Sequence, residues 1–271
     1  MDTYKQEQLH VSLVIPAYND ERYLRAALDS VAAQTILPDE VIVVDNNSTD
    51  GTAAVAVSYP FVRLIRETQQ GVGFASHAGF LAAKYELIAR IDADTVLEPN
   101  WVETALQYFA DHDGVAAITG KCDFYDFPLK RLLWAGHTFA YEYLQGVIAG
   151  TSTLWGSNMV VRKSAWDAAV SKQPVPSINE DIDMSLKLHS QGYSIKRLPS
   201  LVAHVSLLRG QYSPKYTYNY LKPWPQTYVH NGQIIRSYLI RSLKNIIFIT
   251  GLFIMPLHYL LRRAKTSKVS D

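Results

Sequence analysis

Apolar residues in the first part of the chain alternate between short continuous runs and helical spacing. Residues 11–18, VSLVIPAY, form an apolar, β-branched run broken by Pro16, which predicts a buried strand that ends near Ala17. In residues 20–34 the apolar positions recur at helical spacing, and Asn19 or Asp20 precedes them as a candidate N-cap. A helix is therefore expected directly after the first strand.

The same order repeats further along the chain. EVIVVD at 40–45 predicts a second strand, which runs into a polar, turn-rich loop. Residues 61–67 predict a third strand, 73–85 a helix, and 86–94 a fourth strand that ends in carboxylates. Because strands alternate with helices, the pattern predicts a parallel sheet flanked by helices.

The second half is less regular. LWGSNMVVRKSAW at 154–166 predicts a strand leading into a helix, and NEDIDMSLKLHSQG at 179–192 predicts an acidic loop that opens another helix. The pattern contains no linker and no internal repeat. We therefore expect one α/β domain over residues 1–230, with a donor half at about 10–120 and an acceptor half at about 121–230.

The C-terminal residues 231–271 are expected to form a separate helical segment. Residues 246–261, IIFITGLFIMPLHYLL, are apolar and have basic residues on both sides. A membrane-spanning helix needs ~20 apolar residues, and this stretch is shorter and contains Pro256 and His258. We therefore predict an interfacial or re-entrant helix, anchored to anionic lipid by its basic flanks. A buried core helix or a dimer helix is the alternative.

Composition narrows the functional classes. The chain has 26 basic and 25 acidic residues, so a net charge of +1 provides no general field to gather nucleic acid, and no nucleic-acid partner is expected. The one cysteine, Cys122, has no internal disulfide partner, and residues 1–10 lack the apolar core of a secretory signal. We expect a cytoplasmic protein, peripheral on the inner face of the plasma membrane.

Polar residues follow three of the predicted strands at their carboxyl ends. Asn19 and Asp20 follow the first strand, residues 45–50 the second, and residues 92–95 the fourth. In open α/β sheets, ligands bind outside the carboxyl ends of the strands. The three strand ends are therefore expected to meet at one site.

Carboxylates dominate that expected site. Asp92 and Asp94 have the i, i+2 spacing that points both side chains the same way, and such hard oxygen ligands suit Mg²⁺ or Mn²⁺ together with substrate phosphates. A surface pair in a turn is the alternative. Asp45 is placed to accept hydrogen bonds from a nucleobase, although its neighbours also fit an ordinary turn. Acidic residues 180–183 either cap a helix or supply a proton acceptor.

Taken together, PAYNDERYL, VVDNNSTDGT, DADT, WGSNMVVRKSAW and EDIDMSLKLHSQGY resemble the inverting family 2 glycosyltransferases of GT-A fold. The resemblance covers roughly residues 10–205 and includes the order of the motifs. It implies a Rossmann-like, mainly parallel sheet flanked by helices, and a Mn²⁺ or Mg²⁺ cofactor. It further implies a nucleotide-sugar donor, with UDP as the default nucleotide, and a glycan or lipid-linked acceptor.

The resemblance also assigns roles to individual positions. Asp181, with Glu180 beside it, matches the acidic pair that contains the catalytic base, and Asp94 matches the direct metal ligand, with Asp92 close to the ribose or the metal. The positions that match donor-binding residues are Pro16, Ala17, Tyr18, Asn19, Glu21, Asp45, Asp92, Trp155, Gly156, Ser157 and Asn158. The chain departs from the pattern where Ser76 and His77 replace the Arg-Asn pair of many relatives.

These expectations describe an enzyme that transfers a sugar to an acceptor hydroxyl in polysaccharide or glycolipid synthesis. A nucleotidyltransferase is one alternative, but it would need a glycine-rich, basic segment after the first strand, where this chain has PAYNDERYL. A catalytically degenerate protein that binds sugar or membrane on the same scaffold is the other. A missing GxGxxG fingerprint argues against a dinucleotide-dependent dehydrogenase.

Overall fold

The computed structural model describes residues 9–125, 143–169, 174–206 and 214–266. Its strands are β1 (Val11–Ala17), β2 (Glu40–Asp45), β3 (Val62–Arg66), β4 (Leu87–Arg90), β5 (Val96–Leu97), β6 (Val115–Phe124), β7 (Met159–Arg162) and β8 (Ser194–Val205). Its helices are α1 (Glu21–Ala32), α2 (Thr52–Val57), α3 (Val72–Ala82), α4 (Trp101–Asp111), α6 (Gln145–Ala149), α7 (Lys163–Ala169), α8 (Glu180–Ser190), α9 (Pro214–Leu221), α10 (Pro223–His230) and α11 (Ile234–Thr266).

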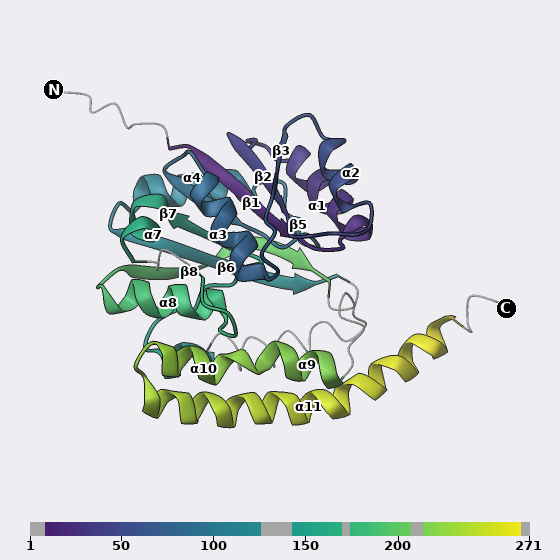
Figure 1. Cartoon of the computed structure of the whole chain (residues 1–271), viewed down its shortest axis with the longest axis vertical. Helices are drawn as coiled ribbons and strands as arrows, with labels where there is room; N and C mark the ends of the chain where they lie inside the picture. Colours follow the sequence, from purple (N-terminus) through teal and green to yellow (C-terminus); the bar gives the residue numbers. More distant parts are fainter. Residues whose placement is uncertain (1–8, 126–142, 170–173, 207–213, 267–271) are drawn as a thin grey trace.

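The strands form one sheet in the order β3-β2-β1-β4-β7-β6-β8-β5 (Figure 1). The four strands predicted from the first half, β3, β2, β1 and β4, pair in parallel. The second half of the sheet is mixed, because β7 runs antiparallel to both β4 and β6, β5 runs antiparallel to β8, and β6 pairs in parallel with β8. The expected mixed α/β architecture is confirmed, with parallel pairs throughout the first half and between β6 and β8 in the second.

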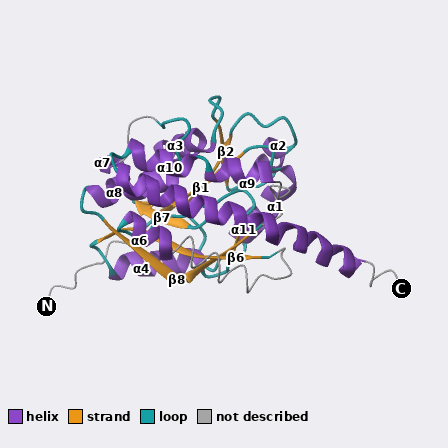
Figure 2. Ribbon diagram, turned by 90° about the horizontal axis from the view of Figure 1, so that it is seen from below, coloured by secondary structure: helices purple, strands orange, loops and turns teal. Residues whose placement is uncertain are grey.

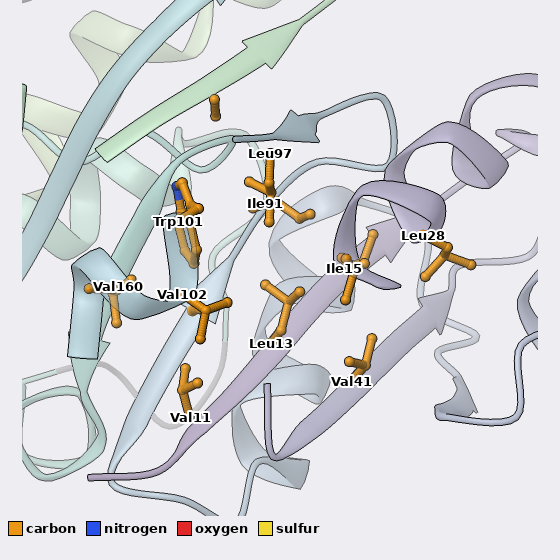
Figure 3. Close-up of a cluster of buried hydrophobic side chains, with 14 of the residues drawn as sticks. Val11, Leu13, Ile15, Leu28, Val41, Ile91, Leu97, Trp101, Val102 and Val160 are labelled. Atoms are coloured by element: carbon orange, nitrogen blue, oxygen red, sulfur yellow. The ribbon is translucent and has the colours of Figure 1, made fainter. Parts of the chain in front are cut away.

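Helices cover both faces of the sheet, and a hydrophobic core fills each side. One core packs α1, α2 and α4 against alternate strand residues such as Leu13, Ile15 and Val41 (Figure 3). The other packs α3, α7 and α8 against the intervening positions, among them Val14 and Ile42. Since successive side chains of a strand point to opposite faces, a strand buried on both sides must be continuously apolar, as β1 is.

The C-terminal helices form a layer next to α8 (Figures 1 and 2). A third core joins α10 and the first half of α11 to α6 and α8 through side chains that include Trp224, Tyr228, Ile240 and Leu243. The predicted C-terminal helix therefore exists, but it begins at Ile234 and its first half packs on the rest of the molecule. Within the described residues, no helix combines the length and apolar character needed to cross a bilayer.

Candidate active site

A cavity of about 870 Å³ opens at the carboxyl ends of the parallel strands. The loop after β1, the turn after β4, the segment before β7 and the start of α8 all contribute to its wall. Of the predicted site residues, those that line it are Pro16, Ala17, Tyr18, Asn19, Asp92, Asp94, Trp155, Gly156, Ser157, Glu180 and Asp181. The structure therefore brings together motifs that lie more than a hundred positions apart in the sequence.

The loop after β1 is fixed by the loop after β2. The backbone N–H of Asn19 donates to Ser48 Oγ at 3.0 Å, and Asn19 Oδ1 accepts from Thr49 N at 2.8 Å. Asn19 has a positive φ of 52°, a conformation that asparagine tolerates better than most residues. Glu21 lies outside the cavity lining and accepts from Gly51 N at 2.9 Å. Its place in the structure is to join the two loops.

Asp45 ends β2 and Asn46 follows it, and Asn46 is the one that lines the cavity. Asp45 is buried, and its Oδ1 accepts from Ser48 N at 3.1 Å. The amide of Asn46 donates to the carbonyl oxygens of Glu67 and Gln69 at 2.9 and 2.7 Å and accepts from Gly71 N at 2.7 Å. Asn46 thus holds the loop that leads into α3 at the edge of the cavity.

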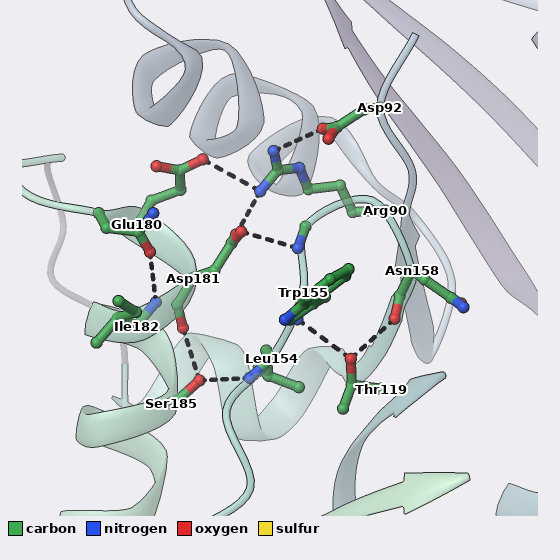
Figure 4. A network of polar contacts seen from close by, with 12 residues as sticks. Arg90, Asp92, Thr119, Leu154, Trp155, Asn158, Glu180, Asp181, Ile182 and Ser185 are labelled. Carbon is green, nitrogen blue, oxygen red and sulfur yellow. Dashed lines mark hydrogen bonds and ion pairs between the residues drawn. The ribbon is translucent and has the colours of Figure 1, made fainter. Parts of the chain in front are cut away.

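Arg90, the last residue of β4, lies at the centre of the site (Figure 4). Its guanidinium is buried and forms ion pairs with Asp92 at 2.9 Å, with Glu180 at 3.2 Å and with Asp181. The side chain thereby joins the turn after β4 to the N-terminus of α8. One positive charge faces these three carboxylates, so the site keeps an excess of negative charge.

The acidic residues at the start of α8 do not act as its N-cap. Asn179 is the N-cap, and its side chain accepts from Ile182 N at 2.9 Å. Glu180 and Asp181 therefore remain available to Arg90, and Asp181 also accepts from Gly156 N at 2.8 Å. Asp183, in contrast, forms a separate ion pair with Lys187, at 2.7 Å between Oδ2 and Nζ.

Burial and charge shift the proton affinity of this cluster. Burial is the main cause that raises the pKa of Asp181 to about 7; Arg90 opposes this effect, and the nearby Glu180 and Asp92 add to it. For Arg90, burial alone would lower the pKa, but Asp181, Asp92 and Glu180 outweigh it and raise the pKa above its ordinary value. Asp181 is therefore poised to exchange a proton near neutral pH, while Arg90 stays charged.

The segment from Leu154 to Ser157 forms another part of the cavity wall. Leu154 N donates to Ser185 Oγ at 2.8 Å and Trp155 N donates to Thr119 Oγ1 at 3.1 Å (Figure 4). Asn158 does not line the cavity: it is fully buried, accepts from Trp101 Nε1 at 2.8 Å and donates to the carbonyl oxygens of Lys121 and Leu201. The structure thus places Asn158 in the core, where its amide joins α4, β6 and β8.

The residues present fit a divalent cation held jointly with substrate. Asp92 and Asp94 both line the cavity and offer hard oxygen ligands. Within the described residues, no group of three or more metal-ligating side chains exists, so the protein does not form a complete cage. A magnesium-like ion usually keeps waters and takes substrate phosphates as its remaining ligands. The excess negative charge around Arg90 favours the same arrangement.

The family model of Glycosyl transferase family 2 matches residues 12–168, which include β1, Asp45, Asp92, Asp94 and the Trp155 segment. The chain belongs to glycosyl transferase family 2. The resemblance inferred from the motifs is therefore confirmed over more than half of the chain.

Two curated relatives illustrate the range of this family. An uncharacterized glycosyltransferase from Nostoc (alr2836) is 35% identical over 154 residues, which cover 54% of this chain and 48% of the relative. The poly-β-1,6-N-acetyl-D-glucosamine synthase of Staphylococcus aureus is 25% identical over 210 residues, which cover 70% of this chain and 48% of the synthase. The matched part thus spans about half the length of both relatives.

Solved structures of low sequence identity share the fold. The mannosyltransferase PcManGT of Pyrobaculum calidifontis, in complex with GDP-Man and Mn²⁺, superposes with a TM-score of 0.62 at 18% identity, covering 96% of this chain and 84% of that one. S. aureus TarS 1–349 in complex with UDP-GlcNAc also gives a TM-score of 0.62 at 18% identity, covering 85% of this chain and 72% of that one. The GT-A fold expected for a family 2 enzyme is confirmed.

Two residues of this family 2 site were missed by sequence reasoning. Asn46 was interpreted as part of an ordinary turn, and nothing in its position separates it from Asn47. Arg90 did carry a signal, because it is a charged residue inside the apolar run LIARI, and a charge in a buried strand requires partners. Its three carboxylate partners lie up to 91 positions away, so the sequence alone could not name them.

Proposed function

We propose that this chain is an inverting, cation-dependent glycosyltransferase that moves a sugar from a nucleotide-sugar donor to an acceptor hydroxyl. The observation that carries the proposal is the joining of Asp92, Glu180 and Asp181 through Arg90 in one cavity. A proton acceptor and a diphosphate site thereby lie next to each other. Family membership supports the transfer of a glycosyl group.

The donor occupies the strand-end side of the cavity in this proposal. Tyr18 is about half exposed at the cavity wall and offers a ring face to a nucleobase, and Asn46 holds the loop beside it. Uracil is the base we propose, so the proposed nucleotide is UDP. The TarS complex contains UDP-GlcNAc and PcManGT contains GDP-Man, so both bases belong in the test.

Asp181 acts as the base. Its carboxylate accepts the proton of the acceptor hydroxyl as that oxygen forms a bond to the anomeric carbon, while the bond from this carbon to the diphosphate oxygen breaks. Attack from the face opposite the leaving group inverts the configuration. Gly156 N–H and Arg90 hold the two carboxylate oxygens of Asp181 in a fixed orientation.

Asp94 and Asp92 would hold the cation, which neutralises charge on the leaving diphosphate when bound. Arg90 engages Asp92 Oδ1 at 2.9 Å, and Asp94 lines the cavity beside it. The chain's own contribution is to keep both carboxylates at the cavity wall next to Asp181.

Calorimetric titration with UDP, GDP and dTDP, each with and without Mn²⁺, tests the donor class. We expect micromolar, Mn²⁺-dependent binding of UDP, lost in Asp94→Ala and kept in Asp113→Ala, whose side chain is 97% exposed. Proton NMR of the product would then give its anomeric configuration. Failure of every nucleotide to bind would reject the proposal and favour a degenerate scaffold.

The acceptor enters from the side of α9 and α10 in this proposal. Thr217, Asn219, Tyr220 and Trp224 line the cavity there, together with Ile247 of α11. Aromatic and hydroxyl side chains of this kind suit sugar rings, and the staphylococcal relative makes a polysaccharide. We therefore propose a glycan or lipid-linked acceptor.

We also propose that α11 binds the cytoplasmic face of the plasma membrane. Its exposed side carries Ile235, Tyr238, Leu239, Ile246 and Ile249, at positions i, i+3, i+4, i+11 and i+14, and Arg241 is exposed beside them. An apolar stripe with basic neighbours suits an anionic bilayer surface.

Flotation of the full chain with vesicles containing phosphatidylglycerol tests this surface. Binding should be lost in Ile235→Glu with Leu239→Glu. It should persist in Val57→Glu, because Val57 is equally exposed but lies on α2. Equal flotation of all three proteins would show that α11 is not the contact.

A further inference from the structure

A second cavity, here called the side cavity, adjoins the main one and has a volume of about 290 Å³. It lies between α3, α7 and α8, and the two cavities share Gln70, Val72, Arg90, Ile178, Glu180 and Pro223. The mechanism proposed above uses Arg90 and Glu180 but leaves the rest of this space without a role. Ser76 and His77, where the chain departs from its family pattern, both line it.

Two buried polar atoms at the side cavity have no hydrogen-bond partner in the described part of the chain. They are Oγ of Ser76 and Nε of Arg90. Ser76 is 6% exposed and Arg90 is 2% exposed, so bulk water does not satisfy either atom. Since an unsatisfied buried donor is costly, both atoms indicate a missing hydrogen-bond acceptor.

The remaining wall is apolar or electrically neutral. Phe80 packs against Trp166 with ring centroids 5.4 Å apart, and His77 lies 5.5 Å from the same ring. The charged side chains are already paired, Asp183 with Lys187 at 2.7 Å and Glu180 with Arg90 at 3.2 Å. The side cavity therefore fits a neutral group that has an acceptor oxygen and an apolar end.

We propose that the side cavity receives the 2-acylamino group of the transferred sugar, so that the donor is an N-acylated amino sugar. The inference rests on the proposed function. Arg90 and Glu180 contact or adjoin the base Asp181, so the substituent that enters here is one close to the anomeric carbon, and C2 is the neighbouring carbon. The acyl oxygen accepts from Ser76 and Arg90, and the alkyl end packs towards Phe80 and Trp166.

The volume of the side cavity extends the inference to the size of the acyl group. The volume of about 290 Å³ far exceeds the ~30 Å³ that one water takes up in the liquid, which leaves room for more than an acetyl group. Donors with a longer N-acyl chain should therefore bind as well as the acetyl donor. An arginine side chain at position 76 would fill the same space.

Titration with UDP, UDP-glucose, UDP-GlcNAc and UDP-N-azidoacetylglucosamine, all with Mn²⁺, tests the side cavity. We expect the two acylated donors to bind at least tenfold more tightly than UDP-glucose. Ser76→Ala should weaken only the acylated donors, by about fivefold. Ser76→Arg should remove the preference altogether. Ser237→Ala, a buried helical serine on α11, should behave like the wild type.

The outcomes separate this inference from the function on which it rests. If UDP and UDP-glucose bind but the acylated donors bind no better, or if Ser76→Ala weakens all donors equally, the side cavity does not take the acyl group and the transferase proposal stands. If none of UDP, GDP and dTDP binds, the proposed function is overturned and this inference with it.

Discussion

Gly156 and Arg90 approach so closely that no side chain fits at position 156. A β-carbon built on Gly156 would overlap Nη1 and Cζ of Arg90. The backbone N–H of the same glycine donates to Asp181, which is also paired with Arg90. The wall segment, the arginine and the proposed base therefore form one unit, in which a change at one member moves the others.

Gly156→Ala should displace the Arg90 guanidinium and misplace Asp181. A misplacement of about 1 Å in a catalytic group costs on the order of 100-fold in rate, so we expect a loss of that size in kcat with little change in the affinity for UDP. Steady-state kinetics measure kcat and KM separately. Gly114→Ala is the matched control, because a β-carbon there meets nothing within 4 Å. Equal rates in both variants would show that the contact is dispensable.

Arg90→Met should destabilise the protein, because it leaves three carboxylates without their counter-charge. Removing one partner of a buried ion pair costs about 3 kcal/mol in free energy of unfolding. The loss should shrink at pH 5, where protonation relieves repulsion among the carboxylates. Urea unfolding at pH 5 and pH 8 measures it, with the exposed Arg66→Met as control. A pH-independent loss would contradict the electrostatic cause.

The transfer rate should depend on the protonation of Asp181. Because burial raises the pKa of this carboxyl to about 7, kcat/KM should fall as pH decreases through about 7 and level off above it. Asp181→Asn should lose activity at every pH. A profile that is flat between pH 5 and 8 in the wild-type enzyme would exclude Asp181 as the titrating base.

The raised pKa of Asp181 also predicts that stability falls as pH rises, whereas the transfer rate increases. A carboxyl with a raised pKa in the folded state binds its proton more tightly when folded than when unfolded. Its contribution to stability is therefore full below the unfolded pKa of about 4 and is lost as pH rises through about 7. The difference in free energy of unfolding between wild type and Asp181→Asn, measured from pH 4 to 8, should follow that curve.

Asn46→Ala should raise KM for the donor more than it lowers kcat. The amide holds the backbone at Glu67, Gln69 and Gly71, and without it the loop before α3 loses its attachment to β2. Asn47→Gly is the comparison, since it removes one hydrogen bond to the backbone of the same loop, to Thr68 O at 2.7 Å, against the three made by Asn46, and glycine adopts its positive φ of 64° without strain. A selective fall in kcat for Asn46→Ala would point to a catalytic role instead.

The sequence predicted the parts of the fold and site that depend on local patterns. The continuous apolar run of β1 and the carboxylates after β4 can be recognised from neighbours in the chain, and parallel strands bring their ends to one edge. It could not predict that β7 would join the sheet antiparallel to β4, because that pairing depends on a return of the chain over many residues.

Side-chain direction limited the site prediction in the same way. Asn158 follows the cavity-lining Ser157 by one position, yet its side chain points into the core and bonds to Trp101. Arg90 lies within a buried strand, yet its long side chain reaches the N-terminus of α8. Motif order identifies which segments meet at a site, whereas the direction of each side chain depends on packing across the whole molecule.

Ile247 lines the main cavity, while its neighbours Ile246 and Ile249 are exposed on the same helix. One helix therefore forms both the cavity wall and the outer surface, and an α-helix with its side chains is ~10–12 Å across. An acceptor anchored in a layer that touches α11 would need to reach only about that distance to enter the site. The thickness of α11 thus sets the shortest tether with which an acceptor anchored in that layer would reach the site.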